Sequence, residues 1–178
     1  MKFKTWIGET ALIFNILVIS NLAFAGNKEF PYMKDGISFS LAKGWNVISN
    51  DSIGNNAWYF SAERGGPKST GLITVTWLNK VENPRETIIL HQRTMKASNI
   101  YKNPGIEFTA VAEDTFATFK VWSCQYTTIV KGEKIEGLIY CFNSSEKTIT
   151  LFFQSGINDK KINQKALGLI KITFNCRG

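Results

Sequence analysis

The chain has 178 residues, 44% of them hydrophobic, and a net charge of +7 at neutral pH. Its charges are scattered, with no run of five of one sign, so no nucleic-acid-binding tract is indicated. A single histidine, no C-x-x-C pair and no D-x-D-x-D-G loop exclude the common metal-site motifs, so neither metal nor cofactor is expected.

The first 25 residues have the pattern of a secretory signal peptide. Two lysines near the start precede an apolar run over 11–24, and Ala23-Phe24-Ala25 forms an A-x-A cleavage site. A membrane anchor is the competing interpretation, but the run is shorter than the ~20 residues of a spanning helix, and Asn15 and Asn21 interrupt it. The segment therefore predicts a soluble exported protein, periplasmic or secreted.

Residues 26–178 then remain, a length that suits one domain with a real core. Removing two lysines and one glutamate with the signal leaves 19 basic and 13 acidic residues, a net charge of +6. A basic surface can meet anionic lipid, cell-wall polymer, nucleic acid or an acidic partner. Because the charges are scattered, a solvated surface without a specific partner is the favoured interpretation.

The first part of this domain is rich in predicted strands. Gly26–Lys34 is expected to be a loose leader. Alternating or β-branched segments predict strands over 37–41, 57–62 and 72–78. The turn Gly44-Trp45 and the polar loops 50–56 and 64–71 separate them.

A helix is predicted from Pro84 to about Ala97. Asn83 as N-cap, Pro84 in the first turn and Glu86 as the capping-box acid give a start signal. Its core candidates are Ile88, Leu90 and Met95.

Further strands are predicted over 106–113, 117–130, 135–142 and 148–154. Asn158 can cap a second helix, with one apolar face made by Ile162, Ala166, Leu169 and Ile170. Strands joined by short turns favour an antiparallel sheet, so the fold class is α+β, with helices packed on one mostly antiparallel sheet.

The longest predicted hairpin spans Val121 to Phe142. With Gly132-Glu133 as the central turn pair, residues whose numbers sum to 265 face each other. Cys124 then lies opposite Cys141 at a non-hydrogen-bonded pair, which predicts a cross-strand disulfide in an oxidising compartment. Cys176 is left over, and three cysteines allow three pairings, among which only the register chooses.

The order of these segments resembles the PsbP-like family, which includes PsbP, Mog and DcrB-type proteins. The matching pieces are ISFSLAKGW, LITVTW, the helix after Asn83, the long hairpin, TITLFFQS and the closing LIKITF. The resemblance covers about residues 35–175 and implies a PsbP-like α-β-α sandwich. It departs from the family at Ala42-Lys43, where a proline is common, and at Thr173, where serine is common. Members of this fold are mostly adaptors and binding proteins, so the resemblance does not assign a function.

Catalytic chemistry is weakly supported. The loop 65–71 lacks glycine directly before Lys68 and is followed by a strand, so it does not match a phosphate-binding loop. His91 lies mid-helix without a local nucleophile. A hydrolase with paired carboxylates needs two acidic residues in one cleft, and the candidates fall at turns or alternating strand positions. They are Glu107, Glu113, Asp114, Glu133, Glu136 and Glu146.

Four tryptophans remain after the signal. Trp77 and Trp122 are expected in the core, and Trp45 and Trp58, on either side of the loop 50–56, are the candidate exposed binding pair. The leading hypothesis is a non-catalytic exported adaptor of the cell envelope that binds a protein partner and is not stably inserted in the membrane. The alternatives are an inhibitor or immunity protein acting through the loops 50–56 and 64–71, and a carboxylate-dependent hydrolase.

Overall fold

The computed structural model describes residues 29–66, 69–102 and 105–177. The predicted signal segment 1–25 lies outside the described residues. The fold consists of two sheets and the helices that pack on them. The strands are β1 (Phe30–Lys34), β2 (Ile37–Leu41), β3 (Trp45–Ile53), β4 (Ala57–Arg64), β5 (Leu72–Leu78), β6 (Ile106–Phe108), β7 (Ala112–Phe116), β8 (Phe119–Val130), β9 (Glu133–Ser144), β10 (Lys147–Gly156) and β11 (Asn175–Cys176). The helices are α1 (Pro84–Ala97), α2 (Asn99–Lys102), the 3-10 turn η3 (Ile157–Asp159) and α3 (Lys160–Thr173).

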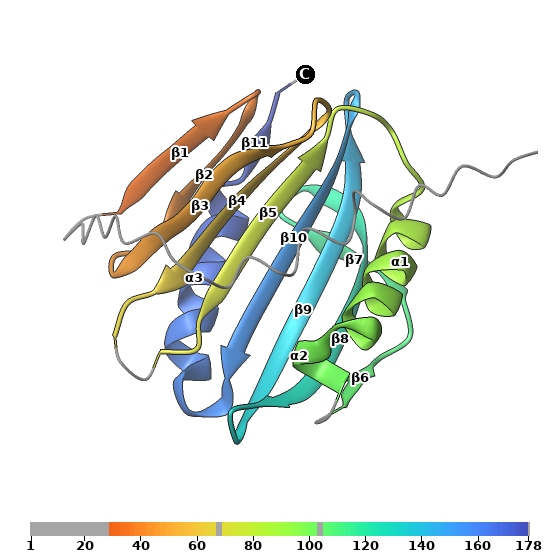
Figure 1. The fold of residues 1–178 in the computed structure, drawn as a ribbon. Helices are drawn as coiled ribbons and strands as arrows, with labels where there is room; N and C mark the ends of the chain where they lie inside the picture. Colours follow the sequence, from red (N-terminus) through yellow and green to blue (C-terminus); the bar gives the residue numbers. More distant parts are fainter. Residues whose placement is uncertain (1–28, 67–68, 103–104, 178) are drawn as a thin grey trace, which may run out of the picture.

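The large sheet is antiparallel throughout, in the order β3-β4-β5-β10-β9-β8-β6, and β7 pairs with β8 next to β6. A small sheet has the order β1-β2-β11. Helix α1 packs on one face of the large sheet, against β8 and β9, whereas α3 contacts β10 and β2 (Figure 1). The molecule is therefore an α-β-α sandwich of the α+β class, as predicted.

Each face of the large sheet carries its own hydrophobic cluster. The larger cluster joins the large sheet, the small sheet and α3, with Phe60, Trp77, Phe142 and Ile170 fully or almost fully buried. The smaller cluster lies beneath α1 and α2, around Tyr126. No helix among the residues that the structure describes combines the length and the apolar character needed to span a bilayer.

Local sequence signals predicted the bounds of two elements correctly. The strand Leu72–Leu78 and the helix Pro84–Ala97 have the predicted bounds, and the side chain of Asn83 accepts hydrogen bonds from the N–H groups of Arg85 and Glu86. Ile88 and Met95 are buried as expected, but Leu90 is 46% exposed, because only a narrow stripe of α1 meets the sheet.

Two predictions at the chain ends were wrong. The expected loose leader contains β1, which pairs with β2 and buries Tyr32 in the larger cluster. Asp159 and not Asn158 occupies the N-cap position of α3, without a side-chain capping hydrogen bond, and the buried face of the helix is Asn163, Ala166, Leu167 and Ile170. Ile162 is 56% exposed, so the true buried stripe is rotated from the predicted one.

The predicted register of the β8–β9 hairpin was also wrong, by two residues. The turn is Lys131-Gly132, with φ of 51° and 82°, and Val130 pairs with Glu133. A type I′ turn needs positive φ at both central residues. Here these residues are Lys131 and Gly132, whereas the prediction had placed Gly132 and Glu133 there. Cys124 consequently faces Ile139, Cys141 faces Trp122, and both cysteines are free thiols.

The candidate functional site

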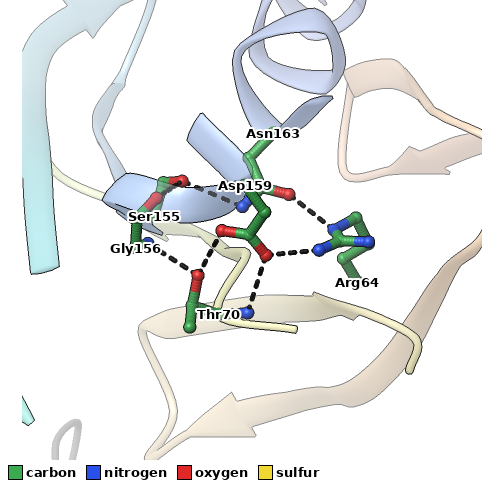
Figure 2. Close-up of polar contacts among 6 residues, drawn as sticks. All are labelled: Arg64, Thr70, Ser155, Gly156, Asp159 and Asn163. Carbon is green, nitrogen blue, oxygen red and sulfur yellow. Dashed lines mark hydrogen bonds and ion pairs between the residues drawn. The ribbon is translucent and has the colours of Figure 1, made fainter. Parts of the chain in front are cut away.

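A closed polar network lies where the β4–β5 loop meets the start of α3 (Figure 2). It is made by side chains and backbone from the end of β4, the residue before Gly71, the end of β10 and the first turns around α3. Its six members are Arg64, Thr70, Ser155, Gly156, Asp159 and Asn163. We call this group the loop clamp.

Asp159 is the acceptor at the centre of the loop clamp. Its Oδ1 accepts a hydrogen bond of 2.5 Å from Thr70 Oγ1, and its Oδ2 accepts one of 3.2 Å from the Thr70 backbone N–H. The same Oδ2 forms an ion pair with the guanidinium of Arg64. The side chains of Asp159 and Arg64 are only 12% and 21% exposed, so this pair is shielded from water more than a surface salt bridge is.

Asn163 closes the network from inside the protein. It is completely buried; its Oδ1 accepts 2.8 Å from Arg64 Nε, and its Nδ2 donates 2.9 Å to Ser155 Oγ. Ser155 Oγ donates to the carbonyl of Gly156, whose N–H donates 2.6 Å to Thr70 Oγ1. A buried amide costs stability unless it is paired, and both ends of this one are.

Two glycines allow these groups to approach one another. A Cβ at Gly71 would lie 2.6 Å from Asn163 Oδ1 and 2.9 Å from the Trp45 ring. A Cβ at Gly156 would collide with Glu133 Oε1 and lie 2.7 Å from Thr70 Oγ1. The clamp therefore needs glycine at both positions for lack of space.

The polar groups of the loop clamp have a structural role and contact one another. Burial acts to raise the pKa of Asp159, but hydrogen bonds from Thr70 and Arg64 outweigh it and hold that pKa below its ordinary value. Both carboxylate oxygens are spent on partners within the protein, so Asp159 is not placed to act as a general base. The network holds Arg64 and Thr70, the residues on either side of 65–69, against the start of α3.

The expected tryptophan pair is not brought together. Trp45 begins β3, is 5% exposed and belongs to the larger cluster, so its predicted exposure was wrong. Trp58 is the second residue of β4 and lies at the other end of the same hairpin, because Trp45 pairs with Arg64 and Ser52 with Trp58. The predicted loop 50–56 was too long, because residues 50–53 belong to β3 and only 54–56 form the turn. That turn and the residues after Arg64 lie at opposite ends of β4, whose eight residues span roughly 26 Å.

Trp58 is half-buried, with aromatic, polar and charged neighbours. Its Nε1 donates 2.8 Å to Asn50 Oδ1, which also accepts from Tyr32 Oη. One neighbour is the stacked ring of Trp77, and the ammonium of Lys34 lies 4.4 Å from the Trp58 ring centroid. Neighbours of this kind occupy the ring surfaces that a sugar or peptide would stack on. Trp77 is fully buried as predicted, whereas Trp122 is half-buried.

The other candidate groups are partly or fully buried, or paired within the protein. His91 is half-buried on α1, and desolvation lowers its pKa to about 4. Burial raises the pKa of the Cys124 thiol, and raises that of Cys141 to about 11. Glu136 forms an ion pair with Lys160. Within the described residues, no three His, Cys, Asp or Glu side chains gather as a metal site.

The loop clamp was not predicted from the sequence. One signal was present: Asn163 stands three residues before Ala166 and seven before Ile170, on the apolar face of a helix. A polar residue in that position predicts a buried hydrogen-bonded partner. The ion pair between Arg64 and Asp159, 95 residues apart, has no comparable local signal.

The layers and topology define a PsbP-like α-β-α sandwich, and comparison with solved structures agrees. The cyanobacterial PsbP (CyanoP) of Synechocystis sp. PCC 6803 matches with a TM-score of 0.56 and 12% identity, covering 91% of this chain and 99% of that one. LpqN of Mycobacterium tuberculosis, involved in cell envelope biogenesis, matches at 0.51 and 14%, covering 84% and 91%. The Ran-binding protein Mog1p of Saccharomyces cerevisiae matches at 0.51 and 10%, covering 85% and 96%.

These identities support a common fold and nothing finer. No protein-family model matches the chain, and no curated protein matches its sequence. The resemblance predicted from the order of segments is thus confirmed at the level of the fold.

Proposed function

We propose that the chain is an exported, non-catalytic adaptor of the cell envelope that binds a protein partner through its β4–β5 loop. The observation that carries this proposal is the loop clamp, which fixes the loop at Arg64 and at Thr70. A loop whose two ends are anchored on a scaffold loses less entropy when it binds than a loop with free ends, which favours recognition. The polar groups of the clamp are consumed in holding the loop and are not aimed at a substrate.

Two further observations support a binding role. The similar structures include a protein described as Ran-binding and one involved in cell envelope biogenesis, so this fold serves binding and envelope roles in other proteins. The export in this proposal is supported by the signal-peptide pattern of residues 1–25, and the location we propose is the periplasm or the outside of the cell.

An inhibitor or immunity protein is the second candidate, and the same loop favours it. A glycine-rich loop anchored at both ends, at one end of the sandwich, can enter the active site of an exported toxin or hydrolase. The structure modifies this hypothesis, however, because residues 50–53 are part of β3 and the turn 54–56 lies at the far end of β4, where it cannot share that contact. A carboxylate-dependent hydrolase gains no support from Asp159, whose two oxygens are already paired.

The test is a pull-down with matched charge reversals. Residues 26–178 are immobilised and exposed to envelope and secreted fractions, with mass spectrometry of the bound proteins. Lys68→Glu reverses the charge that the sequence places in the loop, and Lys120→Glu makes the same change on β8, at the far end of the sheet. We expect one stoichiometric partner whose capture falls at least tenfold for Lys68→Glu and is unchanged for Lys120→Glu.

The identity of that partner separates the two candidates. A toxin or hydrolase that loses activity in the complex establishes an inhibitor, and an envelope component without such activity establishes an adaptor. A partner captured equally well by both variants would contradict the loop as the contact. Turnover of a substrate that is lost on a single carboxylate substitution would contradict a non-catalytic protein altogether.

A further inference from the structure

Helix α3 is unusual in its charge. Residues 160–173 contain four lysines and no acidic residue. Asp159, the acidic residue at its N-cap, is neutralised by Arg64 in the loop clamp. One side of α3 buries Asn163, Ala166, Leu167 and Ile170 against the rest of the protein, so the remaining side determines how the helix meets its surroundings.

The outward side of α3 combines exposed lysines with exposed isoleucines. Ile162 is 56% exposed and Ile172 is 82% exposed, while Lys161 and Lys165 are both exposed. A Cβ built on Gly168 meets no atom within 4 Å, which shows that the middle of this side is open. We call Lys161, Ile162, Lys165 and Ile172 the basic α3 face.

These four residues form one strip along the helix. At about 100° per residue, they fall within an arc of roughly 100°, and Ile162 and Ile172 are separated by about 15 Å along the axis. The other two lysines turn away from the strip: Lys160 pairs with Glu136, and Lys171 Nζ lies 3.2 Å from Tyr140 Oη. Figure 1 places α3 in the layer opposite α1, on the outside of the large sheet.

We propose that the basic α3 face docks on a bilayer containing anionic phospholipid headgroups. A basic helix that lies in the membrane plane binds through apolar side chains at the headgroup boundary and lysines near the phosphates. The strip supplies both, with exposed isoleucines and exposed lysines on one side of the helix. The contact that we propose is peripheral, because α3 would lie along the membrane surface.

A protein partner fits the same strip less well. A stable protein interface buries about 800 Å² on each side and centres on a packed apolar anchor. The two isoleucines here are far apart, with Lys165 between them along the helix, and a single helix face of this length offers much less area. This inference concerns a surface separate from the β4–β5 loop and does not depend on the proposed protein partner.

The test is vesicle co-sedimentation of residues 26–178, which contain every element of the described fold. Vesicles of phosphatidylcholine alone are compared with vesicles of phosphatidylcholine and phosphatidylglycerol in a 3:1 ratio, at low and high sodium chloride. We expect binding to the anionic vesicles at low salt, weak binding to the neutral ones, and loss of binding at high salt, because salt screens exposed charges.

Two pairs of variants locate the contact. Lys161→Glu/Lys165→Glu should weaken binding by about 25-fold or more, since each lysine near an anionic surface contributes about fivefold. The control Arg93→Glu/Lys120→Glu changes the net charge equally at exposed positions of α1 and β8. Ile172→Ser should weaken binding severalfold, whereas Leu90→Ser, at an exposed leucine of α1, should not.

Circular dichroism of each variant confirms that it is folded, which is expected because all the substituted side chains are exposed. Equal loss of binding in the two charge-reversed proteins would overturn the proposal in favour of a general effect of net charge. Failure of the wild-type protein to bind anionic vesicles at low salt would overturn it as well. Sedimentation of a dimer that Ile172→Ser dissociates would assign the face to a second copy of the chain.

Discussion

Two glycines of this protein differ in whether there is space for a side chain at their position. Gly168 lies within α3 and faces open space, whereas a Cβ added at Gly137 in β9 would lie 2.0 Å from atoms of the Tyr126 ring. Glycine in a helix interior costs roughly 0.5–1 kcal/mol relative to alanine, and a methyl group forced into a packed core costs about 1–3 kcal/mol.

We therefore expect Gly168→Ala to raise the free energy of unfolding by about 0.5–1 kcal/mol. The matched change Gly137→Ala should lower it by about 1–3 kcal/mol, because a Cβ there would displace the buried Tyr126 ring. Urea unfolding of the three proteins measures both effects. A destabilised Gly168→Ala protein would mean that the outward side of α3 is covered.

The loop clamp makes stability depend on pH through Asp159. Its pKa is lower in the folded protein than in the unfolded chain, so its contribution is present above the unfolded value of about 3.9 and is lost as pH falls through the folded value. Asp159→Asn removes this contribution, along with the ion pair to Arg64.

At pH 7 we expect Asp159→Asn to cost about 1–3 kcal/mol, the usual cost of breaking hydrogen bonds to a charged, largely buried group. The difference between wild type and variant should shrink as pH falls below about 4. Glu146→Gln, at an exposed carboxylate in the β9–β10 turn, is the control and should change stability little. A difference that stays constant down to pH 2 would contradict the paired state of Asp159.

At the scale of elements, the β8–β9 hairpin shows what a two-residue change of register does. Because side chains alternate with a period of two, the shift keeps Cys124 and Cys141 on the same face but makes them diagonal neighbours and no longer partners. Diagonal positions are about 7–8 Å apart, beyond the usual reach of a disulfide.

Thiol labelling tests this register directly. At pH 8, iodoacetamide should modify the half-buried Cys176 within minutes and leave the other two cysteines unmodified, because burial raises the pKa of both buried thiols. Denaturation without reductant should then expose two further thiols, giving three adducts by intact mass. A single adduct after denaturation would show that Cys124 and Cys141 are bridged, and that the predicted register is the correct one.

The elements also show which parts of the fold were predictable. The strand Leu72–Leu78 and the helix after Asn83 carry their signals within a few adjacent residues, and both were predicted with the right bounds. The hairpin register depended on which residue would accept a positive φ, and nothing in the sequence singles out Lys131. The pairing of Arg64 with Asp159 depends on how β4 and α3 come together, so only the complete fold reveals it.

At the scale of the whole molecule, one aromatic residue links the layers. Phe174, just after α3, packs against Phe39 of the small sheet and against Phe116, Phe119 and Phe142 of the large sheet, with ring centroids 5.3 to 6.2 Å apart. It is 8% exposed, like Phe152 in the smaller cluster, which stacks on Tyr126. The two phenylalanines therefore form a matched pair, one joining the two sheets and one lying within a single face.

We expect Phe174→Ala and Phe152→Ala each to cost about 3–5 kcal/mol, the usual range for a buried phenylalanine. Their local effects should differ, because Phe174 also holds the small sheet on the large one. Amide hydrogen exchange should show protection lost across β2 and β7 in Phe174→Ala, and beneath α1 in Phe152→Ala. Equal loss of protection everywhere in both variants would instead mean that the two clusters unfold as one cooperative unit, with no separable role for the link at Phe174.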